Sequence, residues 1–485
     1  MKPELQPDGQ LARTLGLRGA VTLNLLNMIG VGPFITLPLL IAAMGGPQAM
    51  LGWILGAVLA LCDGLVWAEL GAAFPQAGGT YAYLRAIFPG RPGRALSFVF
   101  LFQVFFSCPL SVASGAIGLG QYAAYLQPRL ATRATAHALQ VAGYTAAVSF
   151  GPQTAVAVLA VLLAVFLLYR NLASIDRISI GMLFLVLSAF ASIVLSALFH
   201  GHLSLAMQMP PGAFRLTPAF FAGLASAMLL ATYDYWGYYN VSLLGGEVRD
   251  PGRTIPQAIL LSIGIVAGLY VSMNLSILSV VPWQSLISDQ GLGARRAMVS
   301  LFMEQAYSSS LGADRAHGLG QAAAVLIVVT AFGGIFALLL GYSRIPYAAA
   351  RDGNFFRIFA RLHPTRGFPY VSLLTLAAAA AIFCLFSLAD VIAALVVIRL
   401  LLQFLTQHIG VLYLRRTQPD LPRPFRLWLY PLPPVLALIG FSYILLARPN
   451  FSRELALAAV VIVIGALLFF LRGRVGGPST EPPRT

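Results

Sequence analysis

The sequence predicts an all-α integral membrane protein with about twelve transmembrane helices. Three observations lead to this fold class: 59% of the 485 residues are hydrophobic, only 10% are charged, and the apolar residues gather in long runs. In a soluble domain roughly a quarter of the residues are charged. A helix needs ~20 apolar residues to cross a hydrocarbon layer ~30 Å thick, and these runs have that length without the period-two alternation of barrel strands.

The apolar runs follow one another along the chain with mostly short polar connections. The longest expected loops are 127–151 and 283–316, and both are predicted to face outward. We place the spans at residues 21–43, 47–73, 95–126, 152–170, 178–199, 216–243, 257–282, 317–342, 369–387, 389–413, 430–448 and 453–472.

The net charge of +15 is explained by the way arginines are distributed among the loops. An even number of helices puts both termini on one side, and with the termini inside most arginines fall in the inner loops, as the positive-inside rule requires. We therefore expect a multi-pass protein of the cytoplasmic (inner) membrane, surrounded by lipids and without a nucleic-acid partner. Residues 1–20 form a cytoplasmic segment, and the Gly- and Pro-containing tail 473–485 is expected to be cytoplasmic and disordered.

The first span contains a helix-breaking sequence halfway along its length. Gly30, Gly32 and Pro33 weaken or interrupt a helix there. Unwound backbone at membrane depth is tolerated only where it lines a cavity or is buried in protein. The freed N–H groups and the positive end of the following half-helix would then face an anion such as a carboxylate. A simple kink or a close helix–helix contact is the alternative interpretation.

The sixth span holds an acid and a glycine, Asp234 and Gly237, within an aromatic cluster. An ionised carboxylate in mid-membrane costs at least ~2.5 kcal/mol, so it normally faces a polar interior. Interrupted helices at corresponding places in two halves point to a transporter site built from inverted repeats. The sequence thus predicts two five-helix repeats, 21–199 and 216–413, followed by two additional helices within 430–472.

Five segments in chain order resemble the amino acid–polyamine–organocation (APC) superfamily, especially bacterial amino acid permeases and L-type amino acid transporters. The resemblance runs from about residue 13 to 445. The segments are 30–34, 68–79, 247–251 with 254–256, 343–344 with 350–353, and 419–424.

The resemblance implies a LeuT-like fold and a secondary active transporter, or permease, that works by alternating access. It implies transport of amino acids, cationic ones included, because family members that prefer cationic amino acids can carry an acid where Asp234 stands. A proton site or a structural ion pair remains an alternative role for this residue. The backbone of the first break would hold the substrate carboxylate, and the second break would take the amino group and side chain. The implied binding residues are Ile29, Gly30, Val31, Gly32, Tyr233, Asp234, Tyr235, Trp236 and Gly237.

The chain departs from the family pattern in ways that bear on partners and coupling. Pro33 replaces the usual isoleucine, and Ala231 stands where relatives often place a gating aromatic residue. Heteromeric members use a cysteine in the loop after the third helix, and 127–151 contains none, so no disulfide-linked ancillary subunit is expected. Sodium-driven members bind the ion with hydroxyls of the eighth helix and carbonyls of the first, and this eighth span offers only Thr330, which argues against sodium. Some proton-driven relatives use a lysine in the fifth helix instead, but Lys2 is the only lysine of this chain. No cofactor is expected. As the driving force for transport, a proton, exchange of one amino acid for another, or the membrane potential is favoured over sodium.

Three further charged residues inside the spans are candidates for gating or coupling. Asp63 and Glu69 are six residues apart, about 240° around a helix, so they cannot share a face. We expect Glu69 to anchor the inner end of its helix. An unpaired Arg399 in mid-membrane would be costly, so we expect it to meet an acid, backbone carbonyls or water. Our hypothesis is that it pairs with Asp234 or Asp63 and helps to close an outer gate; a static buried pair is the alternative.

Two other classes of function compete with amino acid transport. A polyamine or organocation transporter of the same fold would need a second acid near Asp234. A transport-incompetent sensor or a membrane-embedded enzyme would need a soluble domain or a catalytic cluster. His200 and His202 have no acidic ligand pair nearby, and Cys62 and Cys108 lie within spans. The sequence therefore predicts neither an enzyme nor a metal site.

Overall fold

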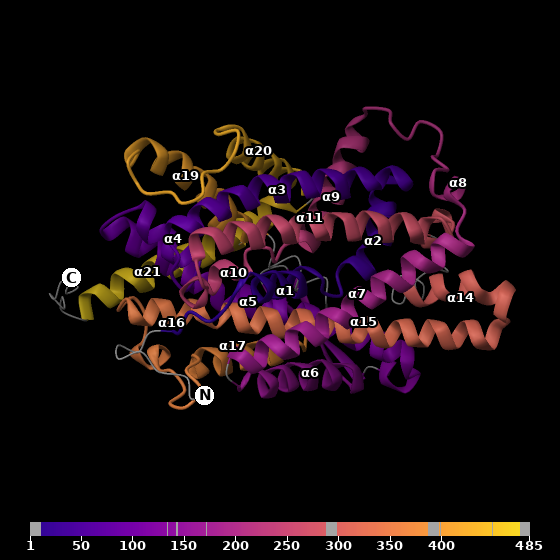
Figure 1. The fold of residues 1–485 in the computed structure, drawn as a ribbon, viewed down its shortest axis with the longest axis horizontal. Helices are drawn as coiled ribbons and strands as arrows, with labels where there is room; N and C mark the ends of the chain where they lie inside the picture. The colour runs from indigo at the N-terminus through magenta and orange to yellow at the C-terminus, as the bar shows by residue number, and fades with distance from the viewer. Residues whose placement is uncertain are drawn as a thin grey trace.

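The computed structural model describes residues 11–132, 134–141, 144–170, 172–287, 298–386, 397, 399–448 and 450–475. Within them the chain forms a bundle whose long helices run along a common direction (Figure 1). The first half comprises α1 (Leu17–Met28), α2 (Pro33–Met44), η1 (Pro47–Ala49), α3 (Met50–Ala73), α4 (Thr80–Ile87), α5 (Arg91–Leu126), η2 (Pro128–Ala131), β1 (Ala134–Val141), β2 (Tyr144–Phe150), α6 (Pro152–Leu168), α7 (Leu172–His200) and α8 (Leu203–Ala206).

The second half repeats the pattern of a broken helix followed by long ones. It comprises α9 (Pro218–Tyr235), α10 (Asn240–Leu243), η3 (Gly245–Glu247), α11 (Pro251–Leu278), α12 (Trp283–Ile287), α14 (Met298–Leu311), α15 (Ala313–Tyr342), α16 (Arg344–Arg351), η5 (Arg357–Ala360), α17 (Tyr370–Phe383), the π-helical turn η6 (Leu400–Leu405), α19 (Thr406–Thr417), α20 (Leu432–Leu446) and α21 (Phe451–Val475).

Each predicted span overlaps a helix or a broken pair of helices. In the described ranges, six helices are long and apolar enough to cross a membrane, or seven if the bent pair α1–α2 is one span; α6, α17 and α20 are shorter apolar helices. The count of about twelve spans and the five-plus-five repeat therefore stay predictions. Parts of the predicted segments 1–20, 283–316, 389–413 and 473–485 lie outside the described residues.

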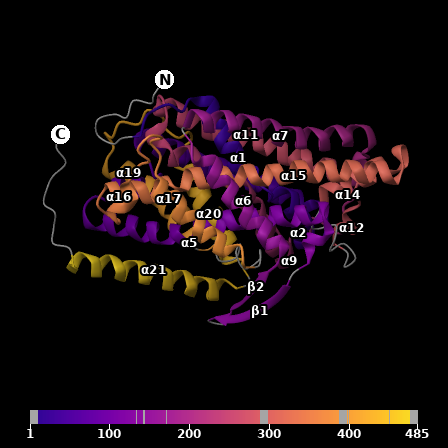
Figure 2. The same ribbon diagram turned by 90° about the horizontal axis from the view of Figure 1, so that it is seen from below.

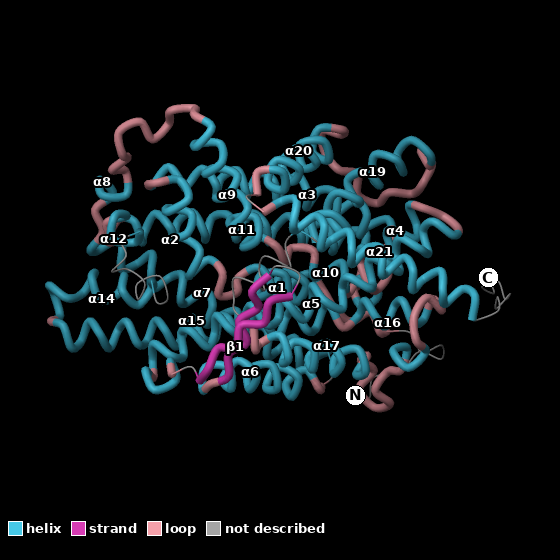
Figure 3. The backbone as a smooth tube through the Cα atoms, turned by 180° about the vertical axis from the view of Figure 1, so that it is seen from behind, coloured by secondary structure: helices cyan, strands magenta, loops and turns pink. Residues whose placement is uncertain are grey.

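The segment 127–151, for which we expected only a loop, contains an antiparallel hairpin. Strands β1 and β2 pair with each other on the outside of the bundle (Figures 2 and 3). The backbone N–H of Ser149 at the end of β2 donates to the carbonyl of Leu385, 2.9 Å away, just after α17. This bond joins the hairpin to the second half of the chain.

The two ends of the bundle are built from different short helices. Helices α4, α16 and α19 gather at one end, and α8, α12 and α14 lie at the other (Figures 1 and 3). Between these ends, α3 packs along α11 and α5 packs along α15. The end that contains α16 and α19 carries basic residues in the last turn of both helices, namely Arg351, Arg415 and Arg416.

Buried ion pairs fasten the chain at this basic end. The guanidinium of Arg344 binds both carboxylate oxygens of Glu247, at 2.8 and 3.2 Å, with both side chains at most 5% exposed. Glu69 at the end of α3 accepts from Arg415 at 2.5 and 2.9 Å and lies 3.3 Å from Arg423. Glu69 therefore links α3 to α19 and to the segment after it, in keeping with the anchoring role predicted for it.

Removing one charge from the Glu247–Arg344 pair should destabilise the fold. Breaking a buried pair leaves an uncompensated charge and costs about 3–5 kcal/mol, whereas exposed pairs contribute about 0–1 kcal/mol. We expect Glu247→Gln to lower the thermal unfolding midpoint of the purified protein clearly. Asp352→Asn is the matched control, because the partner Arg85 and Asp352 itself are 33% and 39% exposed. Equal midpoints for the two variants would contradict this role.

Candidate functional site: a cavity between two broken helices

The first helix break lies where the sequence predicted it. Helix α1 ends at Met28, α2 begins at Pro33, and their axes differ by 49°. The first turn of α2 bonds back to carbonyls of the break: the N–H group of Phe34 donates to Val31, and those of the next two residues donate to Gly32. Those of Val31 and Gly32 have no backbone acceptor among the described residues. Two amides at the positive end of α2 are therefore available to a ligand.

The second break follows α9 and depends on a glycine. Helix α9 ends at Tyr235 and α10 begins at Asn240. Gly237 between them has a φ of 131°, a conformation that residues with a side chain rarely adopt. A Cβ atom there would lie 2.7 Å from the backbone nitrogen of Met28, so only glycine lets the two breaks approach this closely.

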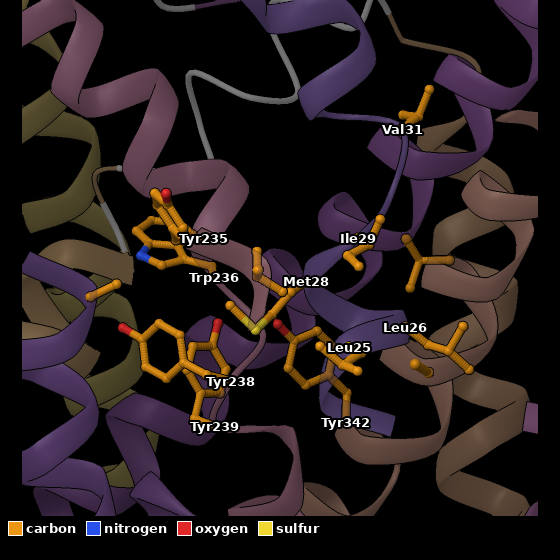
Figure 4. Packing of buried hydrophobic residues seen from close by; sticks show 14 of the residues in the cluster. Leu25, Leu26, Met28, Ile29, Val31, Tyr235, Trp236, Tyr238, Tyr239 and Tyr342 are labelled. Atoms are coloured by element: carbon orange, nitrogen blue, oxygen red, sulfur yellow. The ribbon is translucent and has the colours of Figure 1, made fainter. Parts of the chain in front are cut away.

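Hydrogen bonds join the two breaks across the bundle. The amide of Asn27 donates to the carbonyl of Gly237 at 3.4 Å. The hydroxyl of Tyr270 on α11 lies 2.8 Å from the carbonyl of Met28 and 3.1 Å from that of Asp234. Figure 4 shows Met28, at the end of α1, beside Trp236 of the second break. The prediction that both helices are interrupted and that the interruptions meet is confirmed.

A cavity lies at this junction and is lined by α5 and α15 as well as by both breaks. Ile29 and Tyr235, which the resemblance placed in the site, are not among its lining residues, because both side chains are fully buried elsewhere in the core. Asp63 and Glu69 also lie outside it. The predicted residues that do line it are Gly30, Val31, Gly32, Tyr233, Asp234, Trp236, Gly237 and Arg399.

The carboxylate of Asp234 is held against the start of α2. Its Oδ2 atom accepts a hydrogen bond of 2.5 Å from the hydroxyl of Thr36, and the residue is 3% exposed. A Cβ atom on Gly32 would lie 2.1 Å from Oδ1, so this glycine makes room for the acid. The positive end of a helix stabilises an anion at this position. Oδ1 is buried and has no hydrogen-bond partner in the described chain, so this cavity-lining residue keeps a spare acceptor.

Arg399 does not make the ion pair that we expected. Within the described residues its guanidinium donates to the hydroxyl of Ser111 at 2.7 Å and to the carbonyl of Ser107 at 3.3 Å, and reaches the hydroxyl of Tyr239 at 3.4 Å. It also lies over the rings of Trp236 and Tyr342, at 5.2 and 5.6 Å. Carbonyls, hydroxyls and ring faces can thus stabilise a buried arginine without an acid.

Several polar atoms of the lining are buried without a partner among the described residues. Buried polar groups are nearly always hydrogen-bonded, so a group of unpaired ones around a cavity is typical of a site that a polar ligand completes. These atoms include both hydrogen-bond donors and acceptors, and they belong to an acid, a base and two neutral side chains. The atoms are Asn27 Oδ1, Asp234 Oδ1, Trp236 Nε1 and Arg399 Nε.

Sequence reasoning missed the contribution of α5 and α15 to the cavity. Ser111 and Ser114 on α5 line it, and Ser114 hydrogen-bonds the hydroxyl of Tyr233 at 2.9 Å. Gly334 on α15 also lines it, and a Cβ atom there would lie 3.2 Å from the Cα of Gly30. The pair of adjacent glycines in the eighth span was the available signal, because such pairs mark a close approach of another backbone.

The fold and the cavity define a helical membrane protein with a polar-lined cavity between two interrupted helices, an arrangement typical of transporters. A family model described as "Amino acid permease" matches residues 15–471. The chain therefore belongs to the amino acid permease family within the APC superfamily, as the five sequence segments predicted, and it is an amino acid transporter of that family rather than an enzyme.

Named relatives from animals and bacteria match over most of the chain. Asc-type amino acid transporter 1 of Mus musculus is 27% identical over 472 residues, which cover 95% of this chain and 81% of the relative. The branched-chain amino acid permease BcaP of Bacillus subtilis is 25% identical and covers 96% and 94% of the two chains. The serine/threonine exchanger SteT of Bacillus subtilis is 24% identical and covers 90% and 91%.

Gly32→Ala tests the fit between Asp234 and the first break. The added Cβ would overlap Oδ1 and displace the carboxylate, so we expect apparent substrate affinity to fall at least about tenfold, which corresponds to ~1.4 kcal/mol. Gly264→Ala on α11 is the control, because nothing lies within 4 Å of a Cβ atom there. Concentration dependence of uptake into proteoliposomes measures both variants. Unchanged affinity in Gly32→Ala would contradict the placement of Asp234.

Proposed function

We propose that this protein is a secondary active transporter that moves amino acids across the cytoplasmic membrane by alternating access, with its termini in the cytoplasm. The observation that carries the proposal is the meeting of two helix breaks around a cavity with free backbone amides and an acid with a spare oxygen. Non-helical backbone at membrane depth is stable only where it is buried in protein or lines such a cavity.

The geometry supports one orientation for a bound amino acid. Its carboxylate would accept hydrogen bonds from the N–H groups of Val31 and Gly32, at the positive end of α2. Its ammonium group would lie against Asp234 Oδ1, which offers an unused acceptor and a negative charge. Its side chain would then extend toward α5 and Arg399.

The charges in the cavity bear on the class of amino acid. Asp234 can neutralise the one α-ammonium group that every amino acid carries. A second positive charge near Arg399 would be repelled, because like charges at 4 Å cost about 4 kcal/mol at an effective dielectric constant near 20. We therefore infer that substrates with a neutral or acidic side chain are favoured over cationic amino acids and diamines. Named relatives act on serine, threonine and branched-chain amino acids, which agrees with this inference.

A panel of labelled amino acids and diamines in proteoliposomes tests the proposal, with Asp234→Asn as the informative variant. The amide keeps the shape of the acid but removes the charge that would hold the ammonium group. We expect uptake of every transported amino acid to fall at least about tenfold. Asp314→Asn on the exposed first turn of α15 is the control. Absence of amino acid uptake or exchange by the unaltered protein would refute the proposal.

Arg399→Gln tests which side chains the cavity admits. Glutamine keeps donors for Ser111 but removes the positive charge, so we expect lysine and ornithine to compete for uptake more strongly than in the unaltered protein, while neutral amino acids change less. The ratio of inhibition constants for lysine and for a neutral amino acid measures this shift. The same ratio in both proteins would show that Arg399 has no part in charge selection.

A further inference from the structure

Outside the cavity, the structure brings together two titratable side chains that lie far apart in the sequence. Asp63 on α3 and His408 on α19 are both fully buried, and the Nε2 atom of His408 lies 3.2 Å from the Oδ1 atom of Asp63. The hydroxyl of Tyr238 donates a hydrogen bond to the other carboxylate oxygen, Oδ2. The histidine was not among the residues singled out from the sequence.

The hydrogen bonds of His408 determine which of its nitrogens carries a proton. Its Nδ1 atom lies 2.7 Å from the carbonyl oxygen of Phe404, and because a carbonyl only accepts, Nδ1 must be the protonated nitrogen. In the neutral ring Nε2 is then an acceptor, and it faces Asp63 Oδ1, which is also an acceptor. Neither atom has a hydrogen-bond partner elsewhere in the described chain. Two acceptors 3.2 Å apart can share one additional proton, which would bind between them.

The neighbouring elements surround this pair mainly with neutral groups. From α3 comes the thiol of Cys62, and from the link after α9 come the hydroxyls of Tyr238 and Tyr239. Helix α20 contributes the ring of Phe441, 5.7 Å from the imidazole, and α11 contributes isoleucines beside Gly64.

The charged groups nearest along the chain are engaged elsewhere. Glu69, further along α3, is bound by Arg415 and Arg423. Arg399 contacts the hydroxyl of Tyr239 rather than Asp63. Among the described residues, His408 is therefore the side chain that can supply a positive charge next to Asp63, and it does so only when its imidazole is protonated.

We propose that Asp63 and His408 form a proton-binding site that couples proton movement to the amino acid transport proposed above. One proton from water on one side binds between Nε2 and Oδ1, which converts a buried negative charge into a neutral imidazolium–carboxylate pair. The same proton leaves to water on the other side, and no other bond forms or breaks. A buried charge that gains and loses its counter-charge changes the stability of the helix contact that contains it.

Two contacts connect this pair to the substrate cavity. Tyr238, which binds Asp63, directly follows Gly237 at the second break. Phe404, whose carbonyl holds His408, stacks on Trp236 of the cavity lining with ring centroids 4.9 Å apart. Figure 4 shows Trp236 and Tyr238 on the same side of the first break. A protonation change at Asp63 and His408 thus acts on residues adjacent to the bound substrate.

Proton flux in proteoliposomes that contain a pH-sensitive dye tests the inference. In the unaltered protein, addition of a transported amino acid should acidify the lumen, and an imposed gradient of one pH unit should support about tenfold accumulation per coupled proton. Asp63→Asn places an amide donor where the proton would sit, and His408→Gln removes the imidazole. We expect both variants to exchange internal for external amino acid but to lose proton flux and gradient-driven accumulation. His317→Gln, at a half-exposed contact with Glu304, is the control.

Several outcomes separate this inference from the function on which it rests. Amino acid exchange by the unaltered protein without proton flux would overturn the proton site but leave the transporter in place. Proton flux of normal size in Asp63→Asn and His408→Gln would also overturn it. If either variant fails to fold, Tyr238→Phe decides, because it keeps both titrating groups. Loss of the hydroxyl removes the hydrogen bond to Asp63 Oδ2, so the pH profile of uptake should shift, and an unshifted profile refutes the site.

Discussion

The contact between the two interrupted helices is the feature on which the rest of the structure depends. Backbone N–H and C=O groups that leave a helix cannot be exposed to lipid, so each break is stable only where protein or a polar cavity surrounds it. Gly237 permits the close approach to α1, and the hydroxyl of Tyr270 reaches a carbonyl from each side. Helices α5 and α15 line the cavity at this junction, and α11 packs against α1 beside it.

Buried charges are stabilised in different ways according to what they do. At the basic end of the bundle, Glu69 and Glu247 are paired with arginines and join segments distant in sequence. Near the breaks, Asp234 relies on a hydroxyl and on a helix terminus, and Arg399 relies on hydroxyls, a carbonyl and aromatic rings. Groups with saturated ion pairs suit a permanent fastening, whereas groups with unused hydrogen-bonding atoms suit a ligand or a proton that comes and goes.

Local chemistry explains which features could be predicted. Glycine and proline interrupt a helix through their own backbones, so Gly30, Gly32 and Pro33 predicted the first break without any knowledge of their neighbours. Asp234 was recognisable because an acid in an apolar span is costly wherever it points. By contrast, the acid predicted to pair with Arg399 was wrong, whereas a backbone carbonyl, which was also expected as a partner, does bind it. Several acids, carbonyls and hydroxyls could reach this side chain, and only the packing of α5 chooses among them.

By itself, the sequence determined the membrane class, the family, the positions of both breaks and the presence of an acid at the second one. These properties follow from hydropathy and from backbone chemistry within a few residues. The tertiary structure decided that α5 and α15 complete the cavity, that Ile29 and Tyr235 face the core, and that Asp63 meets His408. Such contacts depend on the rotation and crossing of helices that are remote in the chain, and these are set by side-chain packing, which local patterns do not encode.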